Sequence, residues 1–600
     1  MADSRQQTAD CSPSAICHLP SEGPEGADLS YTFPVPDRNA IYAATLIDAL
    51  HRSGVAHACI TPGSRSTPLA LALAGSAITD WSHHDERSSA FFALGIARTT
   101  RRPVVIVTTS GTAAAELHPA LIEARHAGVP LIAITADRPF ELRDVGAAQT
   151  IDQQGLFGRS VKWAHDTAVP DPAVTGPAHV AALAARLVVE ATTPPAGPVH
   201  LNLRFREPLM PPGPVHPERV AVPRVVAGRL ELTAAAIDAL AEQMAGRRGL
   251  VMAGPQDDPE VPAAVVAFAA ACGWPILADP LSGVRAGTHD LSQVLTASDA
   301  LGWAGFIDSA APEVVVRFGA IPTSKPAGQW LERHRDATQI LIDPTGWRDP
   351  TASAGVVVRA DPAVTLAALA QAVASPTDPT WIERWRSADS AACAALHDLI
   401  DVAPFPNEPA IARTVVESVP DRGVLWVASS MPIRDLDTVM RPVARPLTVR
   451  ANRGANGIDG FLSTVLGAAS ATVAPTIGLA GDLSVLHDLG ALATAARLGI
   501  PATLVAVNND GGGIFHLLPQ AGHPHFERYW GTPHGLDLAA VATALGVKSE
   551  VVIDEERLAE LVSATAHRPR FVEVRTDRTE NADLHRRIRR VVADAVASGS

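Results

Sequence analysis

Short runs of β-branched and other apolar residues recur along this chain, and each run is followed by a polar turn and then by a helical segment. In the amino-terminal third these runs are His57–Ile60, Val104–Thr108, Pro130–Thr135 and Val199–Leu203. Such runs are typical of strands that are buried on both faces, as in a parallel sheet covered by helices. The alternation therefore predicts an α/β fold with doubly wound parallel sheets.

Two proline-rich stretches divide this pattern into three units. Glu207–Arg224 and Val402–Pro409 both have the composition of linkers. We expect a disordered extension over residues 1–36, which lack apolar periodicity, and three consecutive α/β domains over residues 37–212, 213–402 and 403–600. The strands expected in the second and third domains are Leu250–Met252, Ile276–Ala278, Val314–Phe318, Ile340–Ile342, Val424–Val427, Thr476–Ala480, Thr503–Val507 and Phe571–Val574.

Composition excludes several classes of protein. The formal net charge of −14 argues against a general affinity for nucleic acid, which needs a basic face. The five cysteines are odd in number and scattered, so they favour a reducing cytoplasm over a disulfide framework or a zinc knuckle. The uncharged run Phe461–Gly481 is long enough for a membrane span, but its Ser and Thr residues and Pro475 favour a buried helix followed by a strand.

Two polar clusters follow strands of the third unit. Gly481-Asp482-Leu483-Ser484 ends one strand, and 24 residues separate Leu483 from the second cluster, Asn508 to Gly513. The Asp482 carboxylate, the Asn509 carboxamide and the Gly511 carbonyl can offer oxygens to Mg²⁺, and the glycines allow backbone N–H groups to approach a diphosphate. Each cluster alone also suits an ordinary turn. Together, at this spacing, they match the thiamin diphosphate motif, with Leu483 in place of a glycine.

That coenzyme needs a carboxylic acid beside its pyrimidine ring, and the first unit offers Glu86. It lies in the run from Asp80 to Ser88, ahead of the apolar helix expected over Ala90–Ala97. An acid shielded from water there would have a raised pKa. Two other interpretations stay open: a metal site formed by His83, His84, Asp85 and Glu86, and simple capping of the helix by the two acids.

The chain closely resembles the family of thiamin diphosphate-dependent 2-succinyl-5-enolpyruvyl-6-hydroxy-3-cyclohexene-1-carboxylate synthases (SEPHCHC synthases) from about Asn39 to the carboxyl terminus. The matching stretches are Thr61–Leu69, Asp85–Ser88, Thr135–Pro139, Gln149–Gln153, Ser430–Arg434, Asn452–Gly460 and Asn508–Pro519. The Pro-Gly-Ser-Arg-Ser-Thr-Pro and Asn-Arg-Gly-Ala-Asn-Gly-Ile-Asp-Gly sequences are specific to this family, whereas the cofactor motif indicates only a thiamin enzyme.

The resemblance implies a transferase of menaquinone biosynthesis. It would decarboxylate 2-oxoglutarate and add the succinyl carbanion equivalent 1,4 to isochorismate. By match, Glu86 activates thiamin diphosphate, and Asp482, Asn509 and the Gly511 carbonyl hold Mg²⁺ or Mn²⁺. Ile458 would support the bent cofactor. The other implied cofactor contacts are Gly481, Leu483, Ser484 and Ser430.

Charge gives a physical check on that implication, because the two substrates together carry four carboxylates. Arginine suits the bidentate recognition of carboxylates. The family matches place Arg434 and Arg453 on the oxoglutarate side, and Arg65, Arg138 and Lys325 on the isochorismate side. Ser64, Gln149 and Ser430 would add hydrogen bonds, and Ile514, Phe515 and Leu518 would form an apolar wall that excludes water. Each of these arginines could equally be a solvated surface charge.

Two alternatives remain at this point. One is another thiamin diphosphate 2-oxo acid decarboxylase or carboligase, similar to acetolactate synthase, which would need fewer cations. The other is a scaffold that binds the cofactor without catalysis, which intact Glu86, Asp482 and Asn509 argue against. The resemblance also implies a homodimer at least, or a dimer of dimers, because in such enzymes the acid and the metal ligands meet across a subunit boundary.

Overall fold

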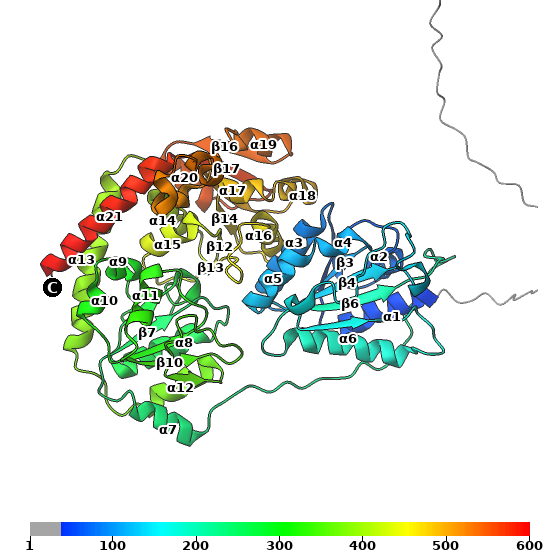
Figure 1. Cartoon of the computed structure of the whole chain (residues 1–600), viewed down its shortest axis with the longest axis horizontal. Helices are drawn as coiled ribbons and strands as arrows, with labels where there is room; N and C mark the ends of the chain where they lie inside the picture. Colours follow the sequence, from blue (N-terminus) through cyan, green and yellow to red (C-terminus); the bar gives the residue numbers. More distant parts are fainter. Residues whose placement is uncertain (1–37, 600) are drawn as a thin grey trace, which may run out of the picture. The chain divides into compact units, whose positions relative to one another are not determined.

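The computed structural model describes residues 38–599, so the extension expected over residues 1–36 lies outside the described part of the chain. Three sheets follow one another along the sequence, and every strand pair in them is parallel (Figure 1). Helices connect the strands and cover both faces of each sheet. The predicted α/β class, with three doubly wound parallel sheets, is confirmed.

The first sheet has the strand order β2-β1-β3-β4-β6-β5. Its side chains alternate between two cores: Val105 and Val107 of β3 face one helical layer, and Val104 and Ile106 face the other. The strands are β1 (His57–Ile60), β2 (Thr79–Ser82), β3 (Val104–Thr108), β4 (Leu131–Asp137), β5 (Trp163–Asp166) and β6 (Val199–Arg204), and the main helices are α1 (Arg38–Arg52), α2 (Thr67–Ala74), α3 (Glu86–Thr100), α5 (His118–Ala127) and α6 (Pro177–Thr192).

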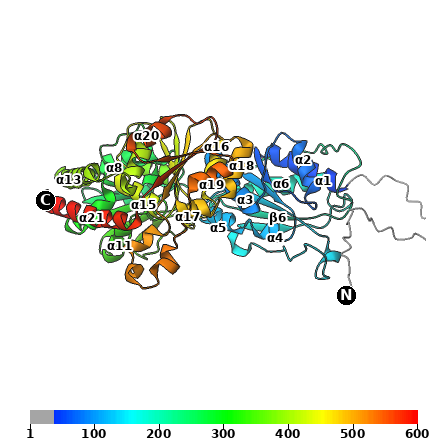
Figure 2. The ribbon, with the colours of Figure 1, turned by 90° about the horizontal axis from the view of Figure 1, so that it is seen from above.

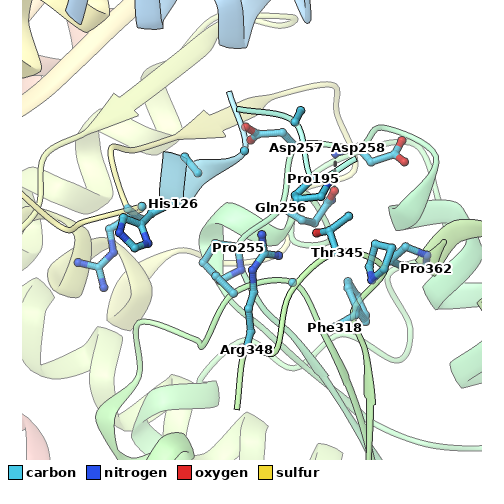
Figure 3. Close-up of a pocket in the computed structure, with 18 of the residues that line it drawn as sticks. His126, Pro195, Pro255, Gln256, Asp257, Asp258, Phe318, Thr345, Arg348 and Pro362 are labelled. Carbon is cyan, nitrogen blue, oxygen red and sulfur yellow. Dashed lines mark hydrogen bonds between the residues drawn. The ribbon is translucent and has the colours of Figure 1, made fainter. Parts of the chain in front are cut away.

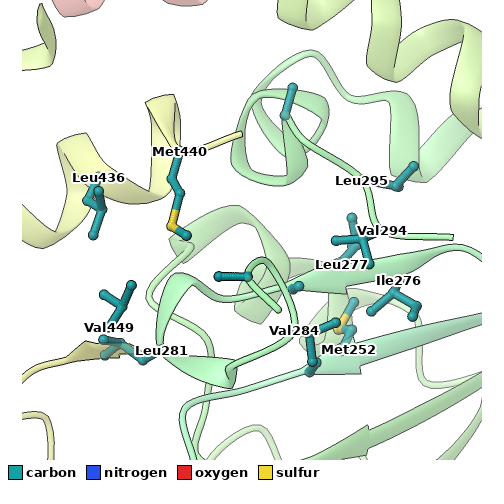
Figure 4. Packing of buried hydrophobic residues seen from close by; sticks show 14 of the residues in the cluster. Met252, Ile276, Leu277, Leu281, Val284, Val294, Leu295, Leu436, Met440 and Val449 are labelled. Carbon is teal, nitrogen blue, oxygen red and sulfur yellow. The ribbon is translucent and has the colours of Figure 1, made fainter. Parts of the chain in front are cut away.

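The middle sheet has the order β11-β10-β9-β7-β8. Its core continues into the third unit: Leu436 in one helix, Met440 directly after that helix and Val449 of an edge strand belong to the same cluster as Leu281 and Val284 (Figure 4). The strands are β7 (Gly249–Ala253), β8 (Ile276–Ala278), β9 (Val314–Phe318), β10 (Thr338–Ile342) and β11 (Val356–Val358), and the main helices are α7 (Ala234–Glu242), α8 (Val261–Cys272), α11 (Lys325–Arg333), α12 (Pro362–Ala372) and α13 (Thr380–Val402).

The third sheet has the order β13-β12-β14-β15-β17-β16. Its strands are β12 (Val424–Val427), β13 (Thr448–Arg450), β14 (Thr476–Gly481), β15 (Thr503–Asn508), β16 (Lys548–Val552) and β17 (Arg570–Arg575). The main helices are α14 (Glu408–Ser418), α15 (Met431–Val439), α16 (Phe461–Ser470), α17 (Asp482–Leu486), α18 (Gly490–Leu498), α19 (Leu538–Ala544), α20 (Glu555–Ser563) and α21 (Arg578–Gly599). The run from Phe461 to Gly481 is a buried helix, a proline break and a strand, as predicted, and none of the described helices is long and apolar enough to cross a membrane.

Helix α3 of the first unit crosses α16 of the third unit with the two backbones in contact (Figures 1 and 2). A β-carbon added to Gly95 would lie 2.0 Å from the carbonyl oxygen of Thr464, and one added to Gly467 would lie 2.0 Å from the carbonyl oxygen of Phe92. Phe91, Phe92 and Phe461 belong to the shared core around the crossing. The crossing therefore requires glycine on both helices.

A half-buried carboxylate, that of Asp257, joins all three units beside this crossing. Asp257, from the loop after β7, accepts hydrogen bonds from Arg98 at the end of α3, and it also pairs with Arg450 of β13. Burial raises the pKa of Asp257, but the guanidinium groups of Arg450 and Arg98 outweigh that effect and lower it to about 2. This carboxylate therefore stays ionised and ties the end of α3 to the other two units.

Substitution of Gly95 by alanine tests the crossing. We expect Gly95→Ala to lower the free energy of unfolding by about 1–3 kcal/mol, because the new methyl group overpacks the contact with α16. Gly328→Ala is the matched control, since Gly328 also lies within a helix but has no atom within 4 Å of an added β-carbon. Chemical denaturation should show the control unchanged or stabilised by up to about 1 kcal/mol. Equal stability of the two variants would contradict the close crossing.

Candidate active site

The carboxyl ends of β14 and β15 bring Asp482 next to the glycine-rich loop. The two strands pair with Gly481 opposite Val507, so the residues that follow them are neighbours. Asp482 is 2 % exposed, and its Oδ2 accepts a hydrogen bond of 2.8 Å from the backbone N–H of Gly511. Burial raises the pKa of Asp482, and the hydrogen bonds from Gly511 and His534 oppose that rise. Helix α17 begins at Asp482 itself.

The Asn509 side chain is held in one orientation by a buried glutamate. Its Nδ2 donates a hydrogen bond of 2.7 Å to Oε1 of Glu408, whereas its Oδ1 is buried without a partner. Thr576 donates a second hydrogen bond to the same glutamate oxygen. Burial, followed by the nearby Asp435 carboxylate, raises the pKa of Glu408 to about 7. The amide oxygen of Asn509 is thus left as a free acceptor.

These groups fit a divalent cation. An unpartnered amide oxygen, a buried carboxylate and a backbone carbonyl are oxygen donors of the kind that Mg²⁺ prefers. Across residues 38–599, no group of three or more His, Cys, Asp or Glu side chains is placed to hold a metal ion. The alternative metal site over His83 to Glu86 therefore has no support from the structure.

The glycines of the loop also have a packing role. Gly511 has φ +132°, and an added β-carbon would lie 1.9 Å from the carbonyl oxygen of Gly531. A β-carbon on Gly513 would lie 2.7 Å from Nδ2 of Asn509. Arg578 donates hydrogen bonds to the carbonyl oxygens of Asp510 and Gly531. The close approach of these backbones fixes Asn509 and Gly511 relative to one another.

Glu86 is the first residue of α3 and is half-buried. The capping residue is Asp85, whose carboxylate accepts a hydrogen bond of 2.7 Å from the N–H of Ser88. Arg87 donates to the carbonyl oxygen of His487, which follows α17. The start of α3, which carries Glu86, is thereby fastened to the segment that begins with Asp482. The Glu86 carboxyl group makes no hydrogen bond or ion pair with the described residues.

His83, three residues before Glu86, is buried and neutral. Both of its ring nitrogens lack a hydrogen-bond partner, and its ring meets Phe92 edge-on at a centroid distance of 4.6 Å. Burial, with the charge of Arg497 as the next cause, lowers the pKa of His83 to about 3. The loop that leads into α3 therefore contains a histidine that resists protonation.

The cations predicted in the first unit form one cluster with Gln149. Arg138 donates a hydrogen bond of 2.7 Å to the carbonyl oxygen of Gln149 and a second one to the hydroxyl of Ser110. The pKa of Arg138 is lowered by burial and then by the charge of Arg65. Arg65 is buried against the carbonyl oxygen of Phe205. Ser64, the residue before Arg65, is exposed.

Arg434 and Arg453 form a second pair of cations in the third unit. The charge of Arg434 contributes to the lowered pKa of Arg453, for which burial is the main cause. Arg434 donates to the carbonyl oxygen of Ser430, which has φ +77° directly before α15. A serine with this backbone conformation is strained, which is typical of functional positions.

The remaining predicted residues are distributed around these groups. Lys325 begins α11 in the middle unit and is exposed, without an ion pair among the described residues. The half-buried apolar residues of the proposed wall and cofactor support are Ile458, Leu483, Ile514, Phe515 and Leu518. Gly481 ends β14, and Ser484 is buried in α17.

A cavity of about 390 Å³ lies where the carboxyl ends of β7, β9 and β10 of the middle unit face the other two units (Figure 3). His126 and Pro195 of the first unit line it. Asp257, Phe318 and Arg348 line it, and so does Arg453 of the third unit. Arg453 therefore borders this cavity in addition to its proximity to Arg434. The sequence pattern did not predict the cavity.

Three carboxylates and one histidine around the site were also not predicted: Glu123, Glu408, Asp488 and His534. Glu123, on α5, accepts hydrogen bonds from the N–H groups of Gly454 and Ala455, and so holds the loop that carries Arg453 and Ile458. His534 Nε2 lies 3.2 Å from Oδ2 of Asp482. None of the four belongs to a recognisable local motif, because each acts on a residue distant in the sequence.

Comparison with known proteins agrees with this arrangement. Residues 41–156 match the family described as thiamine pyrophosphate enzyme, N-terminal TPP binding domain. Residues 225–427 match the middle domain of thiamine pyrophosphate enzymes, and residues 439–574 match the C-terminal TPP binding domain. The crystal structure of benzoylformate decarboxylase from Polynucleobacter necessarius has the same fold, with a TM-score of 0.67 and 18 % identity over 90 % of this chain and 99 % of that one. The protein is a thiamin diphosphate-dependent enzyme.

The curated relatives define the family more narrowly. A 2-succinyl-5-enolpyruvyl-6-hydroxy-3-cyclohexene-1-carboxylate synthase from Geobacillus kaustophilus is 44 % identical, over 94 % of this chain and 99 % of its own length. One from Chloroflexus aurantiacus is 43 % identical over 93 % of this chain and 97 % of its own length. The chain belongs to the SEPHCHC synthase family.

The burial of His83 predicts a loss of stability in acid. The pKa of His83 is about 3 in the folded chain and about 6.5 in the unfolded chain, so the unfolded state binds an extra proton between these values. The free energy of unfolding therefore receives the full contribution of neutral His83 above pH 6.5. As the pH falls from 6.5 toward 3, the free energy of unfolding decreases by about 1.4 kcal/mol per pH unit. Chemical denaturation between pH 7 and pH 4.5 measures how the free energy of unfolding depends on pH. This dependence should be shallower for His83→Phe than for the wild type. His84→Gln, at the exposed neighbour, should retain the wild-type dependence; identical slopes for all three proteins would contradict the assignment.

Proposed function

We propose that this enzyme decarboxylates 2-oxoglutarate and adds the four-carbon succinyl group 1,4 to isochorismate, which gives 2-succinyl-5-enolpyruvyl-6-hydroxy-3-cyclohexene-1-carboxylate and CO₂ for menaquinone biosynthesis. The observation that carries the proposal is the presence of two separate pairs of arginines, Arg65 with Arg138 and Arg434 with Arg453. In each pair the charge of the first arginine contributes to the lowered pKa of the second. Two dicarboxylate substrates need two such groups of cations. The names of the relatives support the same reaction.

Asp482, Asn509 and the Gly511 carbonyl would hold Mg²⁺ or Mn²⁺ on the diphosphate of the cofactor. When bound, thiamin diphosphate supplies a carbon nucleophile for the 2-oxo acid and accepts the electron pair that decarboxylation releases. Glu86 would hold a proton at the pyrimidine ring nitrogen, which needs a half-buried carboxyl group that no other side chain neutralises. The orientation of Asn509 by Glu408 and the unpartnered Oδ1 of Asn509 support the assignment of the metal ligands.

Arg434 and Arg453 would bind 2-oxoglutarate, with Ser430 as a hydrogen-bonding partner. Arg65 and Arg138 would bind isochorismate, with Ser64 and Gln149. The hydrogen bond from Arg138 to Gln149 supports a joint role for these two residues. Lys325 is proposed on the same side. Ile514, Phe515 and Leu518 would exclude water from the reacting carbon.

We also propose domain limits of 37–212, 213–402 and 403–600, and a cytoplasmic location, which the unpaired Cys59, Cys272 and Cys393 support. The enzyme would be at least a homodimer. Residues 213–232 connect the first two units without helix or strand and are largely exposed. Through this connection, the first domain of one copy could pack on the third domain of a second copy. The α3–α16 contact would then cross the subunit boundary, and so would the meeting of the acid with the metal ligands that the family resemblance implies.

An assay with both substrates tests the reaction. With Mg²⁺, thiamin diphosphate, 2-oxoglutarate and isochorismate, we expect CO₂ release and a product whose mass equals isochorismate plus the four-carbon unit. Mass spectrometry of the product is the measurement. Arg453→Lys should raise KM for 2-oxoglutarate by about tenfold and leave KM for isochorismate nearly unchanged, because lysine cannot reproduce the bidentate contact. Consumption of pyruvate without addition to isochorismate would favour the acetolactate-synthase-like alternative.

Sedimentation velocity of the active enzyme tests the assembly. We expect a species with at least twice the mass of one 62.6 kDa chain at the concentrations used for the assay. Active enzyme that sediments only as a monomer would contradict the proposed dimer.

A further inference from the structure

Asp488 joins three helices at the point where the first and third units meet. It is 1 % exposed and lies between α17 and α18. Its Oδ1 accepts hydrogen bonds of 3.0 Å from the hydroxyl groups of Ser88 on α3 and Ser463 on α16. Its Oδ2 accepts a hydrogen bond of 2.7 Å from the backbone N–H of Ser463. One carboxylate therefore connects the first turns of α3 and α16 to the end of α17.

The two residues that must act on opposite ends of the cofactor lie on two of these elements. Glu86 is two residues before Ser88 in the first turn of α3, and Asp482 begins α17, six residues before Asp488. The hydrogen bond from Arg87 to the carbonyl oxygen of His487 runs beside the Ser88–Asp488 contact. The separation of Glu86 from Asp482 thus depends on a short path of hydrogen bonds through Asp488.

We propose that Asp488 is a positioning residue, which through Ser88 sets the place of the Glu86 carboxyl group relative to the cation site at Asp482. The inference rests on the proposed function, because it assigns Glu86 to activation of the cofactor. Asp488 touches neither substrate nor cofactor in this account. A carboxylate is suited to this place because it can accept all three hydrogen bonds at once, while the backbone N–H of Ser463 needs an acceptor.

Ser88 and its neighbour Ser89 offer a matched pair of variants. Ser88→Ala removes only the link from α3 to Asp488 and leaves both contacts of Ser463 in place. Ser89→Ala removes a hydroxyl group of the same size from the next residue, which is also buried but whose Oγ has no partner. Any difference between the two variants therefore reports the hydrogen bond to Asp488 and not the loss of a buried hydroxyl group in general.

The measurement is the rate at which the C2 proton of bound thiamin diphosphate exchanges with deuterium, followed by NMR after rapid quenching, with Mg²⁺ and no substrate. We expect Ser88→Ala to lower the exchange rate by about tenfold, as a small displacement of a catalytic group would do. Ser89→Ala should exchange at the wild-type rate. The dissociation constant of thiamin diphosphate should stay within about twofold in both variants, since Asp482 and Asn509 are untouched.

Substitutions of Asp488 give a graded test of the same proposal. Asp488→Ala should lower the exchange rate more than Ser88→Ala does. Asp488→Asn should stay close to wild type, because its oxygen can accept from the N–H of Ser463 while its amide group donates to the two hydroxyl groups. Chemical denaturation of each variant in the same buffer measures the fraction of folded protein. The exchange rate is then divided by this fraction.

Two results would overturn the proposal. Equal exchange rates for Ser88→Ala and Ser89→Ala would show that the link does not position Glu86. A loss of stability in Ser88→Ala with an unchanged exchange rate per folded molecule would show that Asp488 only holds the fold together. Failure of the proposed function is distinguishable from both, since wild-type enzyme would then bind thiamin diphosphate without accelerating the exchange of its C2 proton.

Discussion

The crossing of α3 and α16 is the contact on which the site depends. Gly95 and Gly467 let the two helix backbones approach until an added methyl group on either would overlap the other chain segment. A contact of this kind fixes both the distance and the angle between the helices. The backbones touch directly at Gly95 and Gly467, so no change of side-chain conformation can move one helix relative to the other. The start of α3, which carries Glu86, and the segment after β14, which carries Asp482, therefore come from distant parts of the sequence but are joined by the hydrogen bonds of Arg87 and Ser88 to His487 and Asp488.

Charge is distributed to match this placement. The chain carries a net charge of −14, yet the arginines near the site lie in pairs: the charge of Arg65 lowers the pKa of Arg138, and the charge of Arg434 lowers the pKa of Arg453. Two neighbouring positive charges repel each other, which raises the free energy of the site when no anion is bound. A bound dicarboxylate would relieve that repulsion, so such pairs suit the binding of dicarboxylates. Acidic side chains in the same region have other hydrogen-bond or ion-pair partners. Asp257 pairs with two other arginines, Glu123 accepts hydrogen bonds from two backbone N–H groups, and Asp488 accepts hydrogen bonds from serines. Within residues 38–599, Arg65 forms an ion pair of 3.4 Å with Glu207, whereas Arg138, Arg434 and Arg453 form none.

The central strands could be predicted from the sequence because burial on both faces leaves a continuous apolar run, as in β3 and β9. The strands that were missed, β2, β5, β11, β13 and β16, all lie at sheet edges. Two of them are only three residues long, and in Lys548–Val552 only Val552 is buried, so neither length nor hydrophobicity marks them. An edge strand forms because it hydrogen-bonds to a neighbouring strand. That partner is distant in the sequence, so the local residue pattern does not predict the edge strand.

The same distinction applies to the site. Asp482, Asn509 and Gly511 lie in local motifs at the ends of strands, so their proximity could be expected from parallel topology. Glu408 and Asp488 could not be expected, because they act through hydrogen bonds to Asn509 and Ser88, 101 and 400 residues away in the sequence. These contacts are products of tertiary packing. Positioning residues of this kind become visible only in the folded chain.

The central claim is that Glu86, from the first unit, and Asp482 with Asn509, from the third, act on one cofactor. Glu86→Gln tests it most directly, by titration of thiamin diphosphate and Mg²⁺ together with the exchange rate of the C2 proton of the bound cofactor. We expect an affinity within about threefold of wild type and an exchange rate lower by at least about 100-fold, because the proposed metal ligands are intact while the proposed proton-holding group is lost. An unchanged exchange rate in Glu86→Gln would contradict it.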